Sequence, residues 1–214
     1  MRKSPGILCI VIGGVLLLAA LGLYGYNRYE DAQAGAEAQV VVQDLEQKLE
    51  QTVKQNAVPS ADEATGEGSD SEEMLSPELP VVMLDGYDYI GVISIPAIDI
   101  KLPVMSEWSY PKLKISPCRE FGSSRTDDLV IAAHNYESHF GKLGSVSVGD
   151  NVIFTDMDGV ENHYIVQKTD VLQPTDVDAV EHSGYDLVLY TCTYGGKTRI
   201  VVFCDRMETV NPKN

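Results

Sequence analysis

Basic residues are scarce in this chain, and their scarcity narrows the partners it can have. The 214 residues include 16 Lys and Arg against 32 Asp and Glu, which gives a formal net charge of −16. Binding to nucleic acid depends on Lys and Arg that neutralise phosphates, so this balance argues against a nucleic-acid partner. Residues 27–90 alone hold 15 acidic and 3 basic residues, a composition typical of a solvated surface.

Cysteine is also scarce, which limits disulfide and zinc chemistry. The four cysteines are Cys9, Cys118, Cys192 and Cys204, and no two of them form a Cys-x-x-Cys motif. This pattern argues against a dense disulfide framework and against the usual structural zinc sites. Cys204 alternates with Ile200 and Val202 along one predicted strand, so we expect it to be a buried core residue. A disulfide between Cys118 and Cys204 stays open.

The sequence contains no convincing site for a resident metal or cofactor. His134, Glu137 and His139 fall in a loop, where the ligand spacing of helical metal motifs does not apply. Carboxylates in loops also suit calcium, and four of them leave a calcium site open: Glu107, Asp127, Asp128 and Asp156. We therefore expect no cofactor, with calcium as the alternative.

Only one apolar run is long enough to span a membrane. Residues 7–26 are almost wholly apolar, and at about 1.5 Å per residue they extend about 30 Å, the thickness of a bilayer's hydrocarbon core. Basic residues precede the run and acidic residues follow it, which favours a cytoplasmic N-terminus. Residues 32–34 leave a cleaved signal peptide as the alternative, but the run is longer than the usual signal core. We predict that residues 1–26 are a cytoplasmic tip and signal anchor of a single-pass cell-membrane protein.

Residues 27–85 are expected to form an extracellular helical stalk and an acidic flexible linker. Residues 30–56 contain no proline, and their apolar residues follow one helical stripe: Val42, Leu45, Leu49 and Val53. The same stripe could seat a weak coiled-coil dimer, although only about two heptads are present. Residues 57–80 hold few large apolar side chains, so we expect a flexible spacer there.

Residues 86–207 break into short β-rich runs, and residues 208–214 form a short C-terminal tail. The candidate strands are residues 89–95, 98–104, 112–115, 129–134, 151–155, 162–169, 185–192 and 198–204. Roughly 120 residues are enough for one compact core. Eight short strands separated by turns predict an all-β fold, a closed eight-stranded β-barrel with short helices and loops.

Three residues with complementary chemistry stand at the ends of these runs. Gly195 and Gly196 make a turn between two apolar strands, so Cys192 and Arg199 come side by side although they are seven residues apart. His134 ends another apolar run. An ordinary thiol is only about 3% thiolate at pH 7, and an imidazole and a fixed positive charge both favour the thiolate. Arginine cannot act as a base, which leaves the histidine as the proton carrier.

These residues make the chain resemble the sortases, the cysteine transpeptidases of Gram-positive cell surfaces. The motifs of that family are a strand-ending histidine, a Thr-Leu-x-Thr-Cys strand and a downstream arginine, and the likeness covers about residues 86–207. Val188 stands where the family often has threonine, and Ala133 stands where glycine often precedes the histidine. Neither difference removes a catalytic group.

The resemblance also bears on the sortase class. The segment between the sixth and seventh candidate strands is too short for the helical insertion of class B enzymes. The Asp-Pro-aromatic lid of class C enzymes is absent ahead of the third strand. We therefore prefer a class D type, with class A as the other possibility.

The resemblance implies a function and a role for each candidate residue. Cys192 is expected to attack an LPXTG-like sorting signal of a secreted protein and to form a thioacyl-enzyme. His134 is expected to serve as acid and base, and Arg199 to hold the signal peptide and stabilise the oxyanion. Thr191 is a further substrate-binding candidate, with a role in capping its strand as the alternative. The acceptor is expected to be an amine of a cell-wall peptide or a lipid-linked precursor.

Three other functions compete with this interpretation. An L,D-transpeptidase also uses cysteine and histidine at the cell wall, but its Ser-x-Gly-Cys surroundings are absent. A papain-like or other cell-wall cysteine peptidase fits less well, because papain-like enzymes place the cysteine before the histidine and at a helix start. A non-catalytic, membrane-tethered binding module is the alternative from another class. Rapid alkylation of Cys192 would separate the enzymes from such a module.

Overall fold

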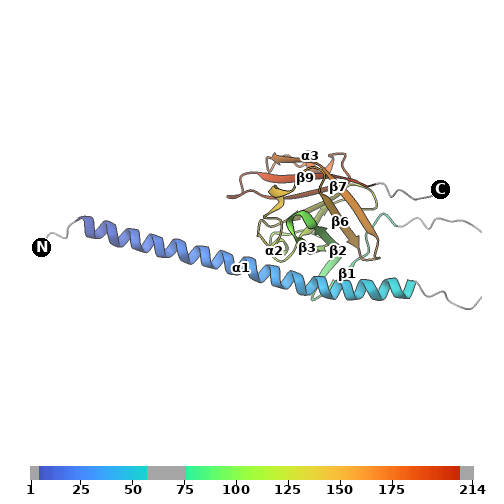
Figure 1. Cartoon of the computed structure of the whole chain (residues 1–214), viewed down its shortest axis with the longest axis horizontal. Coiled ribbons are helices and arrows are strands. Elements are labelled where there is room, and N and C mark those ends of the chain that lie inside the picture. The colour runs from blue at the N-terminus through green and yellow to red at the C-terminus, as the bar shows by residue number, and fades with distance from the viewer. Residues whose placement is uncertain (1–4, 57–75, 208–214) are drawn as a thin grey trace, which may run out of the picture.

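The computed structural model describes residues 5–56 and 76–207, and it shows a barrel of strands beside one long helix (Figure 1). In chain order the elements are α1 Pro5–Asn56, β1 Val82–Leu84, β2 Tyr87–Ile95, η1 Pro96–Ile98, β3 Ile100–Met105, α2 Tyr110–Leu113, β4 Cys118–Phe121, β5 Leu129–Ala133, η2 Leu143–Ser145, β6 Asn151–Asp156, β7 Glu161–Leu172, α3 Asp178–Glu181, β8 Leu187–Cys192 and β9 Arg199–Arg206. Outside α1, most of the described residues in regular elements belong to strands, as the sequence predicted.

Eight strands close into a barrel, which confirms the predicted fold class. Their order is β2-β3-β4-β5-β8-β9-β7-β6, and β6 pairs back onto β2 to complete the circuit. Strand β1 adds a short antiparallel hairpin to β2 outside this circuit. The β3–β4 and β5–β8 pairs are parallel, while the other pairs are antiparallel. The parallel β5–β8 pair matters for function, because both strands end at the same edge of the sheet.

The strand predicted at residues 112–115 is wrong, because these residues are the end of the short helix α2 and the turn that follows it. The Ser109 hydroxyl caps the helix by accepting the Lys112 backbone N–H at 3.3 Å, and Pro111 lies in its first turn. A serine cap followed by an early proline is a helix-start signal, and it overrides a short apolar alternation. The strand lies six residues later, as β4, and β1 was not predicted either.

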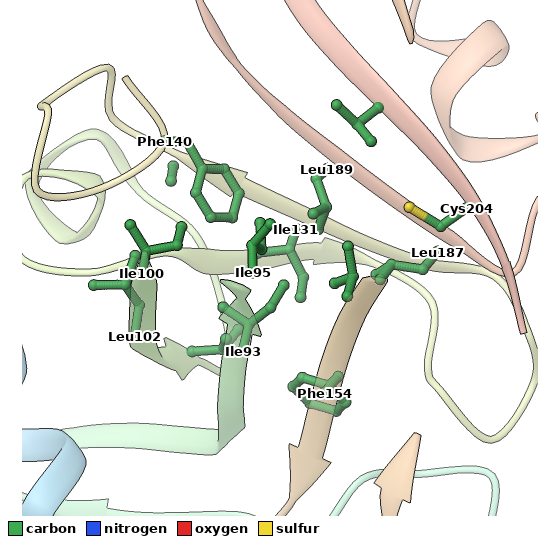
Figure 2. Close-up of a cluster of buried hydrophobic side chains, with 14 of the residues drawn as sticks. Ile93, Ile95, Ile100, Leu102, Ile131, Phe140, Phe154, Leu187, Leu189 and Cys204 are labelled. Carbon is green, nitrogen blue, oxygen red and sulfur yellow. The ribbon is translucent and has the colours of Figure 1, made fainter. Parts of the chain in front are cut away.

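The barrel interior is filled by aliphatic side chains from alternating strand positions. Figure 2 shows Ile93 and Ile95 of β2, Ile131 of β5 and Leu189 of β8 converging there. Cys204 of β9 belongs to the same cluster and is fully buried, as predicted. Burial raises the pKa of Cys204 to about 12. Cys118 and Cys204 are both free thiols and belong to different clusters, so the disulfide considered between them is not formed.

Helix α1 joins the predicted membrane span and the predicted juxtamembrane helix without a break. By length and composition it can cross a membrane near its N-terminal end. Its second half lies against the barrel (Figure 1). Val42 and Leu45 of the predicted stripe are 3% and 0% exposed, packed in a cluster with Tyr89 and Met105. The barrel therefore covers the apolar seam on which a stalk dimer would depend, and this part of α1 is not a detached stalk.

Only the end of the predicted linker lies among the described residues. Residues 57–75 of the predicted spacer lie outside the described residues. Leu79, which the predicted spacer included, is 6% exposed and belongs to the main barrel core, so this residue is part of the packed domain. A single leucine among acidic and small residues carries little signal in the sequence, although it anchors the chain where it enters the barrel.

Replacing Leu45 with alanine tests the docking of α1. The side chain is fully buried, so we expect the free energy of unfolding to fall by about 2–4 kcal/mol. The matched control is Leu49→Ala, because Leu49 is only partly buried against the same cluster and its truncation should cost less. Denaturant unfolding of the full chain in detergent measures both. Equal losses in the two variants would contradict the docking.

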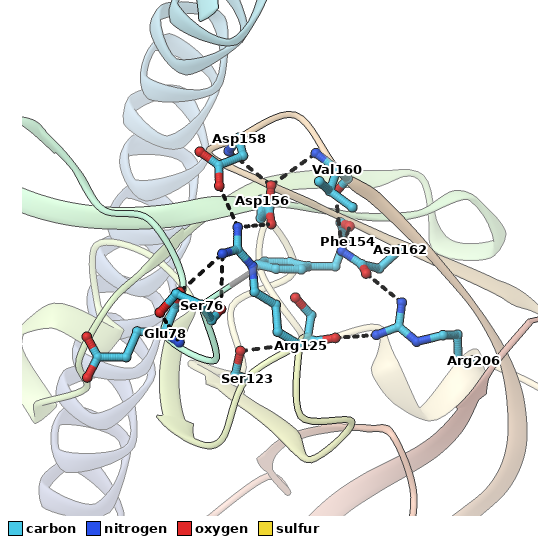
Figure 3. A network of polar contacts seen from close by, with 11 residues as sticks. Ser76, Glu78, Ser123, Arg125, Phe154, Asp156, Asp158, Val160, Asn162 and Arg206 are labelled. Carbon is cyan, nitrogen blue, oxygen red and sulfur yellow. Dashed lines mark hydrogen bonds and ion pairs between the residues drawn. The ribbon is translucent and has the colours of Figure 1, made fainter. Parts of the chain in front are cut away.

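Two arginines hold the loops at one end of the barrel (Figure 3). Arg125 pairs with Asp156 at 3.0 Å and Asp158 at 2.6 Å, and it also donates to the backbone oxygens of Ser76 and Glu78. Its guanidinium thus ties the incoming chain to the β6–β7 turn. At the same end, Arg206 donates to Asp127, Asn162 and the Ser124 carbonyl. Two of the four carboxylates considered for calcium, Asp127 and Asp156, therefore pair with arginine.

Candidate active site

The ends of three neighbouring strands bring the candidate residues together. Strands β5 and β8 run parallel with Ala133 opposite Thr191, so the next residues along, His134 and Cys192, follow the same register. Strands β8 and β9 run antiparallel with Cys192 opposite Arg199. The sheet therefore aligns the imidazole, the thiol and the guanidinium in one row across three strands.

All three candidate residues belong to the outer face of the barrel wall. Side chains alternate between faces along a strand. Ile200, Val202 and Cys204 of β9 contact the interior core. Val201 and Phe203 instead join Val130 and Val188 in a second cluster outside the wall. Arg199 shares the face of Val201 and Phe203, as the alternation in the sequence predicted.

A cavity of about 240 Å³ opens on this face, and Cys192 and Arg199 both line it. One wall is formed by Leu172, the last residue of β7, and by the connection between β7 and β8, which contributes Val177 and Val180 among other residues. Trp108 and Tyr110, from the connection between β3 and β4, form another wall and stack edge to face at 5.3 Å. Apolar walls with a thiol and a guanidinium between them are suited to holding an extended peptide.

The floor of this cavity carries a polar pair that the sequence did not reveal. The Tyr190 hydroxyl donates to Glu120 Oε2 at 2.5 Å, and both residues line the cavity. Burial raises the pKa of Glu120 above its usual range, although the hydrogen bond from Tyr190 opposes the shift. Glu120 was missed because the strand that carries it, β4, was not predicted.

His134 directly follows Ala133, which lines the cavity, and it is half-buried against an aromatic ring. Its imidazole stacks on Tyr136 with ring centres 3.9 Å apart and planes inclined by 31°. Within residues 5–56 and 76–207, its buried Nδ1 has no hydrogen-bond partner. Burial, followed by the charge of Lys114, lowers the pKa of His134 below its ordinary value. The neutral imidazole is therefore the favoured form at pH 7, ready to accept a proton.

The other three histidines occupy positions that do not suit a proton carrier beside Cys192. His139 is fully buried, and burial lowers its pKa to about 4. His163 and His182 lie on the surface and pair with Glu161 and Asp178. His134 is the histidine that follows β5 next to the Cys192 strand.

The hairpin between β8 and β9 holds Arg199 in place. Its Nη1 donates to the backbone oxygens of Gly196 at 3.1 Å and Thr198 at 3.2 Å. Gly195 and Gly196 have φ of +80° and +71°, which glycine adopts without strain, and the predicted Gly-Gly turn is present. Among the described residues, the guanidinium is tethered at this one nitrogen, and its other donors are available to a ligand.

Thr191 does not contact the cavity, and its predicted role in substrate binding needs correction. Its side chain is 1% exposed and faces the barrel interior, because it is one residue out of phase with Cys192. The hydroxyl donates to the Ala133 backbone oxygen at 2.9 Å. Thr191 therefore ties β5 to β8 just before His134 and Cys192, which is the structural role that we considered as the alternative.

Comparison with known proteins agrees with this geometry. A Sortase domain family model matches residues 93–207. Sortase A of Bacillus anthracis is 26% identical over 195 residues, covering 87% of this chain and 84% of the relative. Among solved structures, sortase C1 of Streptococcus suis is 27% identical with a TM-score of 0.51, covering 59% of this chain and 76% of that one.

Two further solved structures extend the comparison. Sortase C1 of Streptococcus agalactiae is 28% identical with a TM-score of 0.51 over 59% of this chain and 72% of that one. A sortase D5 transpeptidase of Clostridium perfringens has a TM-score of 0.56 over 80% of this chain and 99% of that one, and at 17% identity it supports the fold alone. The family model covers more than half of the chain, so the chain belongs to the sortase family of cysteine transpeptidases.

Proposed function

We propose that this sortase cleaves an LPXTG-like sorting signal in secreted proteins and joins them to an amine of the cell wall. The observation that carries the proposal is the alignment of His134, Cys192 and Arg199 at neighbouring strand ends, with Cys192 and Arg199 lining one cavity on the outer face of the barrel. An extended peptide in this cavity would pass the thiol and the guanidinium together. The accepting amine belongs to a cell-wall peptide or to a lipid-linked precursor.

In the first half of the reaction, Cys192 is acylated. His134, neutral in the resting enzyme, takes the thiol proton as the sulfur attacks the scissile carbonyl carbon. A carbon–sulfur bond forms, and the carbonyl oxygen becomes an oxyanion. When this intermediate collapses, the carbon–nitrogen bond breaks and the His134 imidazolium returns its proton to the leaving amine. A thioester between Cys192 and the new carboxyl end of the protein remains.

In the second half, the acceptor amine replaces the sulfur. The amine attacks the thioester carbonyl, and His134 removes its proton. The carbon–sulfur bond breaks, the sulfur leaves as a thiolate, and His134 returns a proton to it. The products are a new amide bond and the resting enzyme, so the cycle needs no oxidant, metal or nucleotide.

Arg199 is assigned to the substrate carbonyls and the oxyanion. Two hairpin carbonyls hold one of its nitrogens, which leaves the planar fork pre-oriented toward the cavity that it lines with Cys192. A preorganised donor of this kind contributes about 2.7–4 kcal/mol to the transition state.

Replacing Arg199 with lysine is therefore expected to lower turnover about 100-fold or more, because lysine keeps the charge but loses the fork. Steady-state kinetics with a sorting-signal peptide measure this change. The matched control is Lys197→Arg, a change between the same two residue types on the neighbouring turn. Near-normal turnover of the Arg199 variant would reject the assigned role.

The long apolar segment of α1 supports a membrane-bound enzyme with its barrel outside the cell. The helix is long and apolar enough to span a bilayer at its N-terminal end. Basic residues before the span favour a cytoplasmic N-terminus. Protease protection of intact cells tests the orientation, because the barrel would then be cleaved while the first residues are protected.

The sortase class stays a prediction, with class D preferred and class A possible. The β7–β8 connection supports the exclusion of class B, since its described helix α3 spans only Asp178–Glu181. The relatives named above are sortases of types A, C and D. Substrate preference, measured on peptides, is the property that separates these classes.

Incubation with a panel of sorting-signal peptides tests the proposed function. We expect the intact protein to gain a mass that tracks the N-terminal fragment of the accepted peptide, attached at Cys192. Adding an amine such as hydroxylamine should release that fragment with the amine attached. If no peptide in the panel forms an adduct while the protein remains folded, the chain acts on a different substrate or binds without catalysis.

A further inference from the structure

We infer that the anchor helix α1 takes part in catalysis by holding the loop that follows His134, with Asp31 as the positioning residue. This inference rests on the proposed role of His134. It concerns residues that carry no motif of the family and that lie more than 100 residues apart in the sequence.

Asp31 joins the helix to the loop with several hydrogen bonds. Its carboxylate accepts the backbone N–H of Glu137 at 3.3 Å and that of Ser138 at 3.0 Å. The Ser138 hydroxyl lies 2.6 Å from Asp31 Oδ1 and 3.0 Å from the Asp31 backbone oxygen. Arg28, one turn earlier on α1, pairs with Glu137 at 2.7 Å. Two consecutive loop residues are thus fastened to one face of α1.

Asp31 stays charged although it is largely buried. Asp31 is only 9% exposed, and this burial alone would raise the pKa of its carboxyl group. Hydrogen bonds from Ser138 and Glu137, with the nearby charge of Arg28, outweigh burial and lower that pKa. An ionised carboxylate accepts stronger hydrogen bonds than a neutral group, so the loop is fastened most firmly at neutral pH.

The fastened loop contains the ring that orients His134. Tyr136, which stacks on His134, directly precedes Glu137 and Ser138. Phe140 donates its backbone N–H to the His134 oxygen at 3.3 Å, which closes the loop back onto its start. Any shift of residues 137–138 therefore moves the aromatic ring that covers the imidazole.

His134 depends on this packing because its buried Nδ1 has no polar partner among the described residues. A catalytic histidine is usually oriented by a third residue that accepts a hydrogen bond from Nδ1. In the described part of the chain, Nδ1 of His134 is buried without such a partner. Stacking on Tyr136, in a loop fastened by Asp31, supplies the orientation instead.

The helix approaches the loop too closely for any residue but glycine at position 35. A Cβ on Gly35 would lie 2.7 Å from Cβ of Ser138, closer than carbon atoms can pack. Gly35 is one turn beyond Asp31, so both face Ser138 from the same side of α1. The flanking helix residues Ala34 and Ala38 are 6% and 2% exposed and are also small.

This contact couples the membrane anchor to the active site. The apolar segment ends at Tyr26, five residues before Asp31, which corresponds to about 8 Å along a helix. Helix α1 is unbroken between Tyr26 and Asp31. The loop after His134 is therefore fixed to the helical turns that directly follow the predicted membrane span. Enzyme lacking residues 1–35 would lose this support even if its barrel folded.

The test compares two carboxylates of α1 in the full chain, purified in detergent. Asp31→Ala removes the loop contact, while Glu46→Ala removes a carboxylate that pairs with Lys101 of β3 elsewhere on the barrel. We expect Asp31→Ala to lower kcat about ten-fold or more with KM changed by less than about two-fold, because orientation of the proton carrier is lost and the binding cavity is not. Glu46→Ala should leave both constants unchanged.

Two further variants separate positioning from a loss of stability. Gly35→Ala favours the helix yet forces Ser138 away, so kcat should fall while α1 remains helical by circular dichroism. The Asp31→Ala, Ser138→Ala double variant should lose no more kcat than Asp31→Ala alone, because the two residues act through one contact. An unchanged kcat in both Asp31→Ala and Gly35→Ala, or an equal loss in Glu46→Ala, would overturn the inference.

Alkylation of Cys192 keeps this test independent of the substrate. Iodoacetamide should react with Cys192 more slowly in Asp31→Ala than in the wild type and in Glu46→Ala, because His134 assists the thiol less effectively. If no peptide is accepted by the wild-type enzyme, the proposed function fails but this comparison still decides the role of Asp31. Equal alkylation rates in the three proteins would count against it.

Discussion

Replacing Cys192 with alanine is expected to abolish adduct formation with a sorting-signal peptide and to lower turnover by about 10⁴-fold or more. The structure offers no substitute nucleophile at this position among the described residues. Thr191 faces the barrel interior, and Cys118 and Cys204 are each fully buried. Burial also raises the pKa of Cys118 and of Cys204 to about 12, which keeps both as unreactive thiols.

The control for this variant is Cys118→Ala. That change removes a buried thiol that donates a hydrogen bond to the Ser116 backbone oxygen, so it should cost some stability and leave kcat within about two-fold of the wild type. Release of a quenched fluorescent peptide measures turnover, and intact mass measures the adduct. Residual turnover above about 1% in Cys192→Ala would show that another group performs the attack.

Replacing His134 with glutamine is expected to lower kcat by about 10²–10⁴-fold, the contribution of a positioned acid and base. Glutamine keeps a polar side chain of similar length but carries no titratable proton. The matched control is His182→Gln, since His182 lies on the surface and pairs with Asp178. A loss of equal size in the two variants would contradict the assignment of His134.

The same assignment fixes the direction of the pH dependence. Burial and the charge of Lys114 lower the pKa of His134 below its ordinary value of about 6.5. The reaction starts from the neutral imidazole, so kcat/KM should hold as pH falls and decline only below about 6.5. Lys114→Gln removes a like charge and should raise the His134 pKa, moving the decline to higher pH. A move to lower pH would contradict the electrostatic account.

The barrel and the three candidate residues were predictable because their signals are local. Strand alternation separated Arg199 from Cys204, and the Gly-Gly turn placed Arg199 beside Cys192; the register of β8 and β9 agrees with both. The adjacency of His134 came from the family resemblance alone, since pairing between β5 and β8 leaves no mark in a single sequence.

The rest of the site depends on contacts between distant segments, which local patterns do not encode. The apolar stripe with Val42 and Leu45 indicated a buried helical face but not the barrel surface that covers it. Thr191 was assigned to substrate because it adjoins Cys192, although alternation alone places it on the opposite face. In the sequence, Asp31 does not differ from the other acidic residues of the predicted stalk. Its contact with Ser138 is visible only in the fold.

The strand prediction for residues 112–115, after Ser109, was wrong for a different reason. Residues 112–115 alternate between basic and apolar side chains as a strand does. The periodicity therefore favours a strand, whereas the capping residues favour a helix. The serine cap and the early proline decide the outcome, because they satisfy backbone N–H groups that a strand would have to pair with a neighbour. A helix capped by Ser109 leaves room for a strand only after it. That strand is β4, which carries Glu120 into the cavity.

Alkylation rates of the individual cysteines test the central claim most directly, namely that an activated thiol stands in an open cavity beside His134 and Arg199. The full-length protein is treated with iodoacetamide at pH 7, quenched at intervals and mapped by peptide mass spectrometry. We predict that Cys192 reacts about 100-fold or more faster than Cys118 and Cys204, and that His134→Gln removes most of this difference. Comparable rates at the three cysteines, or a fast Cys192 that is insensitive to His134→Gln, would contradict the account.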